Sequence, residues 1–182
     1  MATPGDGTLR RTVRAGWHTA AVGNRRRILV DPDSRLRAAT RPVRLPDKGL
    51  RRLIDDMVVT MRLADGVGLA APQLGEPLRL AVVEVKGVLI VLGNPAVVRT
   101  GFPAVDWEGC LSVPERVAQV RRPAEIVIVA DDIEGRRVRH RGTGLLARAF
   151  QHEMDHLAGR LYVDLVDPAD LVDTRLHPIA PG

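Results

Sequence analysis

The sequence predicts an α+β domain in which antiparallel or mixed β-sheets surround a central C-terminal helix that carries the pattern His-Glu-x-x-His. Three observations point to this fold class. The first two are a helical spacing of apolar residues before a run of short β-rich segments and a second helical spacing after them. The third is size, because 182 residues of which 45% are hydrophobic suit one globular domain with a core. We therefore expect a single folded domain.

Two flanking segments differ in composition from this domain, which we place at residues 28–166. Residues 1–27 form an Arg-rich N-terminal extension that we expect to be flexible or loosely docked. Residues 167–182 form an acidic C-terminal tail with two Pro-containing turns.

The first elements of the domain follow from its prolines and its apolar spacing. Residues 28–43 contain Asp-Pro and Arg-Pro steps, which disfavour a helix, so this stretch should run extended. A helix should begin near Asp47 and end at Asp65-Gly66. Its apolar residues are spaced by three and one along one face: Leu50, Leu53, Ile54, Met57, Val58 and Met61.

Strands should fill the middle of the chain. Residues 78–95 are typical of two strands that are broken at Lys86-Gly87, the second ending at Asn94-Pro95. Further strands are expected at residues 118–121, 126–130 and 137–140. A second helix, capped by Thr143, should run through Leu157 and end at Gly159. A short strand should follow it.

Composition narrows the classes of function. No stretch approaches the roughly 18 apolar residues of a membrane-spanning helix, so we expect no membrane contact. The single Cys excludes an internal disulfide and fits a reducing compartment, for which we expect the cytoplasm. The net charge of +5 comes without a recognisable nucleic-acid-binding module, so we expect no specific nucleic acid. Nothing in the sequence predicts the oligomeric state.

The second helix predicts a metal site. Leu145, Ala149, His152 and His156 share one helical face, so the apolar stripe runs into two histidines. Two histidines at i and i+4 can reach one metal ion, with Glu153 beside its bound water as general base and acid. Such an ion lowers the pKa of its water from ~15.7 to about 7. The pattern indicates a metal-dependent hydrolase.

The third protein ligand has two sources in the sequence. Peptidases of the zincin type take it from downstream, where the candidates are Asp164, Asp167, Asp170 and His177. The upstream candidate is Cys110 in the segment EGCLSVP, where the neighbouring Gly109 permits close approach of the backbone. A lone Cys is also commonly an inert buried residue, and sometimes a nucleophile.

One more segment bears on the chemistry. GVGLAAPQ, residues 66–73, lacks the third glycine of a dinucleotide-binding loop and could be a plain loop after the helix. Its last residue, Gln73, has an amide that can donate a hydrogen bond to an oxyanion without competing for the metal.

Together, GVGLAAPQ, EGCLS and QHEMDHLAG, in this order, resemble the three motifs of the peptide deformylases. The similarity extends from residue 28 to about residue 164. It implies removal of the N-formyl group from the N-terminal formylmethionine of newly synthesised polypeptides, with release of formate. It further implies that the partners are N-formylmethionyl peptides and nascent chains, met in transient proximity to the ribosome.

The resemblance also assigns roles to single residues. Cys110, His152 and His156 would bind one divalent metal ion, usually Fe²⁺ in this family, with Zn²⁺, Ni²⁺ or Co²⁺ also able to occupy the site. Gln73 and the backbone N–H of Leu111 would stabilise the oxyanion, and Glu153 would move protons. Substrate contacts fall on the motifs and on the ligand helix: Val67, Gly68, Gly109, Leu145, Arg148 and Ala149.

The chain departs from the family pattern at a few positions. Trp107 stands where an acidic residue is common, and Arg148 occupies a pocket position that is apolar in some members. The acidic tail differs from the basic C-terminal helix with which some members dock on the ribosome. Two alternatives stay open: a zincin-type metallopeptidase with an acidic third ligand, and a non-catalytic homologue that binds nascent chains.

Overall fold

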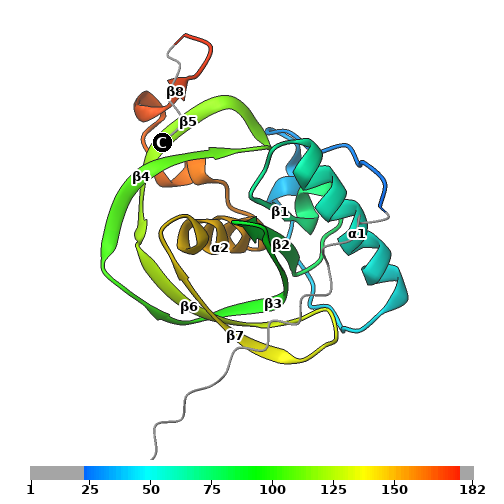
Figure 1. Cartoon of the computed structure of the whole chain (residues 1–182). Coiled ribbons are helices and arrows are strands. Elements are labelled where there is room, and N and C mark those ends of the chain that lie inside the picture. The colour runs from blue at the N-terminus through cyan, green and yellow to red at the C-terminus, as the bar shows by residue number, and fades with distance from the viewer. Residues whose placement is uncertain (1–22, 177–182) are drawn as a thin grey trace, which may run out of the picture.

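The computed structural model describes residues 23–176. Helix α2 (Gly144–Leu157) lies in the middle of the molecule, curved strands surround it, and helix α1 (Lys48–Leu63) packs to one side (Figure 1). The strands form a five-stranded sheet in the order β1-β2-β3-β6-β7 and a three-stranded sheet in the order β4-β5-β8, and the strand pairs for which a register is defined are antiparallel. This arrangement confirms the predicted α+β fold with its central C-terminal helix.

The bounds of the strands and short helices are as follows: β1 Gly68–Ala70, β2 Leu80–Val85, β3 Val88–Thr100, β4 Pro103–Cys110, β5 Val113–Pro123, β6 Glu125–Asp131, β7 Arg137–Thr143 and β8 Val172–Asp173, with 3₁₀ helices η1 Ser34–Arg37, η2 Ala71–Leu74, η3 Tyr162–Leu165 and η4 Pro168–Asp170.

Helix α1 begins and packs as its sequence predicts. The side chain of Asp47 caps it by accepting a hydrogen bond from the backbone N–H of Leu50 at 2.9 Å. Its buried face, with Ile54, Met57 and Met61 fully inaccessible, packs against residues of β1 and β2. The helix thus covers one side of the core and ends just before Gly66, the first residue of the first motif.

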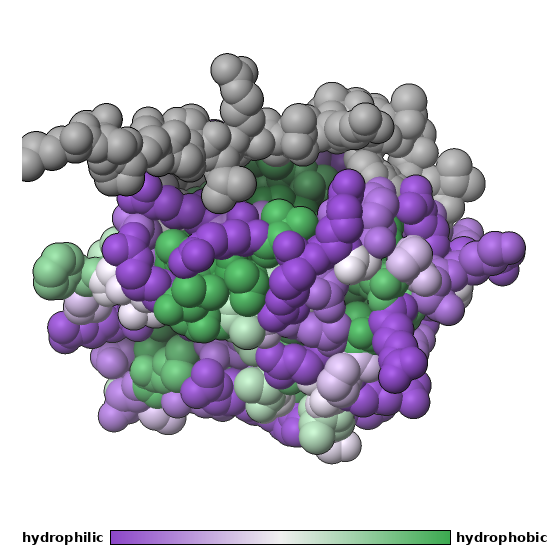
Figure 2. All heavy atoms as spheres, turned by 90° about the horizontal axis from the view of Figure 1, so that it is seen from below, coloured by the Kyte–Doolittle hydropathy of each residue, from purple (hydrophilic) through white to green (hydrophobic). Residues whose placement is uncertain are grey.

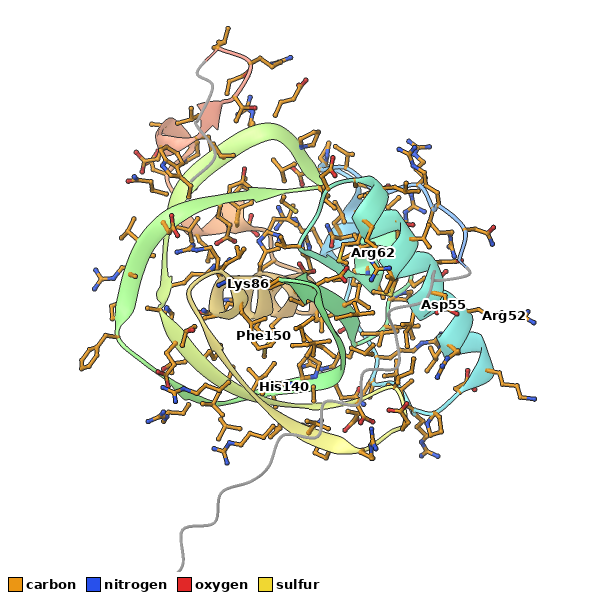
Figure 3. The ribbon with its side chains drawn as sticks, in the orientation of Figure 1. Arg52, Asp55, Arg62, Lys86, His140 and Phe150 are labelled. Atoms are coloured by element: carbon orange, nitrogen blue, oxygen red, sulfur yellow. The ribbon has the colours of Figure 1, made fainter. Side chains whose placement is uncertain are left out.

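Helix α2 is held against the five-stranded sheet by its apolar face. Phe150 is fully buried, and its ring lies 6.1 Å from that of His140 on β7 (Figure 3). Ala147 and Leu157 join the same core cluster, which includes Ile126 and Ile128 of β6. Thr143 occupies the N-cap position as predicted, but its side chain makes no capping hydrogen bond. The two histidines project from the other side of the helix, toward Cys110 at the end of β4.

Strand β3 does not end at Asn94-Pro95 as predicted; it continues to Thr100. The pairing with β6 shifts register between Gly93 and Ala96, so Pro95 lies in a bulge where no N–H is needed. Asn94 has a φ of 48°, and its side-chain amide donates to Val43 O at 2.8 Å and Asp131 Oδ2 at 2.7 Å. These hydrogen bonds stabilise the kink and let the strand continue.

Other elements differ from the sequence prediction. Residues 34–37 form the 3₁₀ helix η1 inside the stretch expected to be extended, because Asp33 caps it through the N–H of Arg35. Strand β4 was not predicted, and β5 is longer than expected at residues 118–121. After α2 the chain forms η3 in place of a short strand, and the strand β8 comes only at Val172.

The described part of the N-terminal segment lies along α1. The backbone N–H of Asn24 donates to Asp56 Oδ1 at 2.7 Å, and that of Arg26 donates to Thr60 Oγ1 at 2.8 Å. Residues 1–22 of the predicted extension and residues 177–182 of the predicted tail lie outside the described residues.

The outer surface carries both hydrophobic and hydrophilic side chains. Seen from the side of β6 and β7, small hydrophobic areas are separated by hydrophilic residues (Figure 2). Within residues 23–176, no helix has the length and apolar character needed to cross a bilayer.

Candidate metal centre

Three side chains from two elements bring their ligand atoms together. His152 and His156 lie one turn apart on α2, with their Nε2 atoms 3.2 Å from each other. Cys110, at the end of β4, places its Sγ 3.2 Å from His156 Nε2, and all three ligand atoms lie within 4.8 Å of one another. Ligands of a tetrahedral metal ion at ordinary bond lengths stand about 3.4 Å apart, so the spacing suits a single ion.

The geometry identifies Cys110 as the third ligand. Within residues 23–176, no other group of three His, Cys, Asp or Glu side chains converges in this way. Asp164, a downstream candidate, instead binds the guanidinium of Arg37 and accepts a hydrogen bond from Leu161 N at 2.8 Å. Asp167 caps η4, Asp170 is exposed, and His177 lies outside the described residues.

The protonation state of His156 suits a ligand. Burial lowers the pKa of its imidazole well below the usual value, because the charged form is desolvated there. With its proton on Nδ1, the neutral ring would offer the lone pair of Nε2, the atom that faces Cys110 and His152, to a metal. Protons therefore compete little with the metal at this position.

Glu108 orients the other ligand histidine. Its Oε1 lies 2.6 Å from His152 Nδ1, which leaves Nε2 of the same ring for the metal. Burial opposes the charge on Glu108, but hydrogen bonds from Arg122 and His152 outweigh it and lower the pKa of this carboxyl to about 2. Glu108 is therefore a carboxylate at neutral pH. Sequence reasoning gave this residue no role, although it lies inside the second motif.

Arg122 connects this carboxylate to α2. Its guanidinium makes a bidentate pair with Glu108, at 2.7 and 2.6 Å, and its Nη1 donates to Asp155 Oδ2 at 2.7 Å. The three side chains are only 7%, 4% and 8% exposed, and Arg148 at Glu108 and Arg160 at Asp155 help Arg122 to offset the two buried carboxylates. Asp155 is buried and is connected to His152 through Arg122 and Glu108.

Glu153 is a buried carboxyl with an unused oxygen. It is 3% exposed, and its Oε2 finds no hydrogen-bond partner within residues 23–176. Burial raises its pKa to about 7, because the charged form is desolvated. A Cβ atom on Gly68 would stand 2.3 Å from its Oε1, so only a glycine fits opposite it. A carboxyl with this pKa can both accept and return a proton near neutral pH.

Gln73 directs its amide nitrogen toward the ligands. Its Oε1 accepts from Ala70 N at 2.8 Å, and Nε2 donates to Ser112 Oγ at 3.1 Å and lies 3.8 Å from Cys110 Sγ. The backbone N–H of Ser112 also donates to Cys110 Sγ at 3.3 Å. Sequence reasoning missed Ser112, whose signal is its place two residues after the Cys.

A cleft of about 470 Å³ opens onto these groups. It is lined by every predicted catalytic and substrate-binding residue and by two of the metal ligands: Val67, Gly68, Gln73, Gly109, Cys110, Leu111, Leu145, Arg148, Ala149, His152 and Glu153. His156 lies behind them and is 1% exposed. The structure thus brings all the sequence-predicted site residues together.

The guanidinium of Arg148 is not a free positive charge in the pocket. Its Nη1 donates to Glu108 Oε2 at 2.9 Å and to Val120 O at 3.1 Å, and the residue is 9% exposed. Its charge is therefore compensated by the same carboxylate that holds His152. Trp107 also lines the cleft.

Comparisons with known proteins agree with this geometry. A family model described as polypeptide deformylase matches residues 25–171. A peptide deformylase of Dictyoglomus thermophilum is 45% identical over 132 residues, which cover 72% of this chain and 86% of the relative.

Solved structures match as well. The crystal structure of a peptide deformylase from Legionella pneumophila is 44% identical, has a TM-score of 0.78, and covers 80% of this chain and 88% of that one. A class I type b peptide deformylase from Acinetobacter baumannii, solved with Met-Ala-Ser bound, is 30% identical with a TM-score of 0.74, covering 78% and 98% of the two chains.

Proposed function

This chain belongs to the peptide deformylase family, and from that premise we propose that it removes the N-formyl group from the N-terminal formylmethionine of newly synthesised polypeptides, releasing formate. The observation that carries the proposal is the convergence of Cys110 Sγ and the two histidine Nε2 atoms beside Glu153 in an open cleft.

The ligand set fits one divalent ion, which when bound supplies a Lewis acid that activates water and polarises the formyl carbonyl. Family resemblance favours Fe²⁺, with Zn²⁺, Ni²⁺ or Co²⁺ as alternatives. A Cys sulfur beside two imidazole nitrogens suits each of these soft or borderline ions better than Mg²⁺ or Ca²⁺.

Proton transfer falls to Glu153. Its carboxylate takes a proton from the attacking water and returns it to the amine that leaves with the peptide. Its burial and its pKa of about 7 support both steps at neutral pH. The unpartnered Oε2 is the oxygen available for this exchange.

Two donors stabilise the oxyanion that develops on the formyl oxygen. The amide of Gln73 faces Cys110, and the backbone N–H of Leu111 belongs to the residue after that ligand. Gln73 is fixed in place because its oxygen is held by Ala70 N. Such pre-set donors act without reorganisation when charge appears.

The substrate peptide lies along the cleft as an added strand between Gly68 and Gly109. Its methionine side chain enters a pocket formed with Val67, Leu145, Arg148 and Ala149. The relative that was solved with Met-Ala-Ser supports a peptide of this kind as ligand. Nascent chains that emerge from the ribosome in the cytoplasm are the source of such termini.

Anaerobic purification, metal analysis and an assay of formate release from formyl-Met-Ala-Ser test the proposal. Cys110→Ala should lose bound metal and activity, because one of three protein ligands is gone. Asp167→Ala, the matched control, should keep both. The reverse pattern would establish a zincin-type peptidase with an acidic third ligand.

Glu153→Gln separates an enzyme from a binding homologue. We expect it to keep its metal and its peptide affinity but to lose about 10² to 10⁴ in kcat, since only proton transfer is removed. Metal content is measured by elemental analysis and turnover by formate production. A variant that turns over normally contradicts the role of Glu153.

A further inference from the structure

The last described residues of the chain lie at the exposed end of the cleft. Strand β8 pairs with β5, Val172 opposite Val117 and Asp173 opposite Arg116. The next residue, Thr174, lines the cleft together with residues 113–117 of β5. The proposed chemistry makes no use of this contact.

On its other edge, β5 departs from β4 just beside the metal ligand. Gly109 pairs with Val117, but the next residue, Cys110, pairs with Val113. Residues 114–116 therefore have no partner on β4 and form a bulge. All three line the cleft and are exposed, so the bulge is the wall that a peptide passes when its formyl end is at Cys110.

The bulge has an unfavourable backbone conformation that its neighbours must hold. Glu115 has a φ of 62°, in the left-handed region that residues with a side chain rarely adopt. The N–H of Thr174 donates to Glu115 O at 2.9 Å, and the guanidinium of Arg175 lies 3.2 Å from the Glu115 carboxylate. The hydroxyl of Tyr162 donates to Arg116 O at 2.8 Å. The C-terminal segment thus supports the bulge from outside.

We propose that β8 and Thr174 brace residues 114–116 as the wall that contacts the residues following methionine in the substrate. The brace sets the affinity for peptides of two or more residues, while binding of the methionine itself depends on the pocket near Ala149. This inference rests on the proposed function, because it concerns how the same cleft holds its peptide.

A pair of variants at Thr174 tests the brace. Thr174→Pro removes the N–H that donates to Glu115, whereas Thr174→Ala keeps it and removes only side-chain atoms. Dissociation constants of Met-Ala-Ser and of methionine amide are measured by calorimetry on the metal-loaded full chain. We expect Thr174→Pro to weaken Met-Ala-Ser about fivefold, the effect of one lost hydrogen bond, with methionine amide unchanged. Thr174→Ala should weaken Met-Ala-Ser less than Thr174→Pro does, because it keeps the N–H that donates to Glu115.

Two truncated chains test the same proposal in case Thr174→Pro prevents folding. A chain ending at Leu171 lacks β8, and a chain ending at Leu176 keeps it. The shorter chain should show the same selective loss for Met-Ala-Ser, with full metal content. Equal weakening of both ligands, no weakening, or loss of metal from the shorter chain would overturn the brace.

The binding pattern is independent of turnover. If the unmodified chain with full metal releases no formate, the deformylase function fails, while the selective effect on Met-Ala-Ser still decides the role of β8. If formate is released but the selective effect is missing, the brace alone fails.

Discussion

At the metal centre, the backbone of Gly68 lies very close to the side chain of Glu153. The strand residue approaches the carboxyl so closely that a single added methyl group would overlap Oε1, at 2.3 Å. The overlap involves a buried side chain packed between α2 and β1, which has little room to move.

We predict that Gly68→Ala lowers kcat by at least tenfold, because the carboxyl must rotate away from the position in which it exchanges protons. Formate release measures the effect, and metal content should stay near that of the unmodified protein. Gly49→Ala, on the exposed first turn of α1, is the control and should leave kcat unchanged. Full activity of Gly68→Ala would show that the Glu153 side chain can move aside without loss of proton transfer, which would contradict this prediction.

At the scale of elements, Arg122 joins β4, β5 and α2 through one side chain. It lies on β5, pairs with Glu108 on β4 and reaches Asp155 on α2. Both carboxylates are buried, so neither finds water if the guanidinium is removed.

Arg122→Met should therefore lower the free energy of unfolding by up to about 3 to 5 kcal/mol, the cost of removing one partner of a buried ion pair, with Arg148 and Arg160 left to offset part of the carboxylate charge. Urea denaturation measures this change. Arg99→Met removes an exposed partner of Glu125 and should cost no more than about 1 kcal/mol. Similar losses for the two variants would contradict the structural role of the buried network.

The helices and strands also show which parts of the structure can be predicted from the sequence. Both helices and the ligand pair were predictable because helical spacing places His152 and His156 on one face whatever surrounds them. Strand β4 and the partners Glu108 and Arg122 were not, because which residues face each other across β4 and β5 depends on a register that local sequence does not define. The bulge in β3 was missed for a related reason: Asn94-Pro95 signals a turn, and the side-chain bonds of Asn94 that prevent it come from distant residues.

At the scale of the whole molecule, the metal should act as a cross-link between two parts of the fold. Cys110 belongs to β4 and the histidines to α2, so an ion held by them would join the three-stranded sheet to the central helix. A ligand set assembled only in the folded state couples metal affinity to stability.

We predict that removing the metal with a chelator lowers the melting temperature by about 5 to 10 °C relative to protein with metal at 100 times its dissociation constant. Differential scanning calorimetry measures both states. Cys110→Ala is the control and should melt at the same temperature with and without added metal. A shift that survives in this variant would place the stabilising ion elsewhere.

The separation of the three ligands in the sequence has a consequence during synthesis of the chain. Cys110 leaves the ribosome well before His152 and His156, so an unfinished copy holds only one of the three groups that bind the ion. Until synthesis has passed α2, a growing copy has no activity toward its own first residue or any other. The metal centre of each copy can therefore form only after residue 156 has been synthesised.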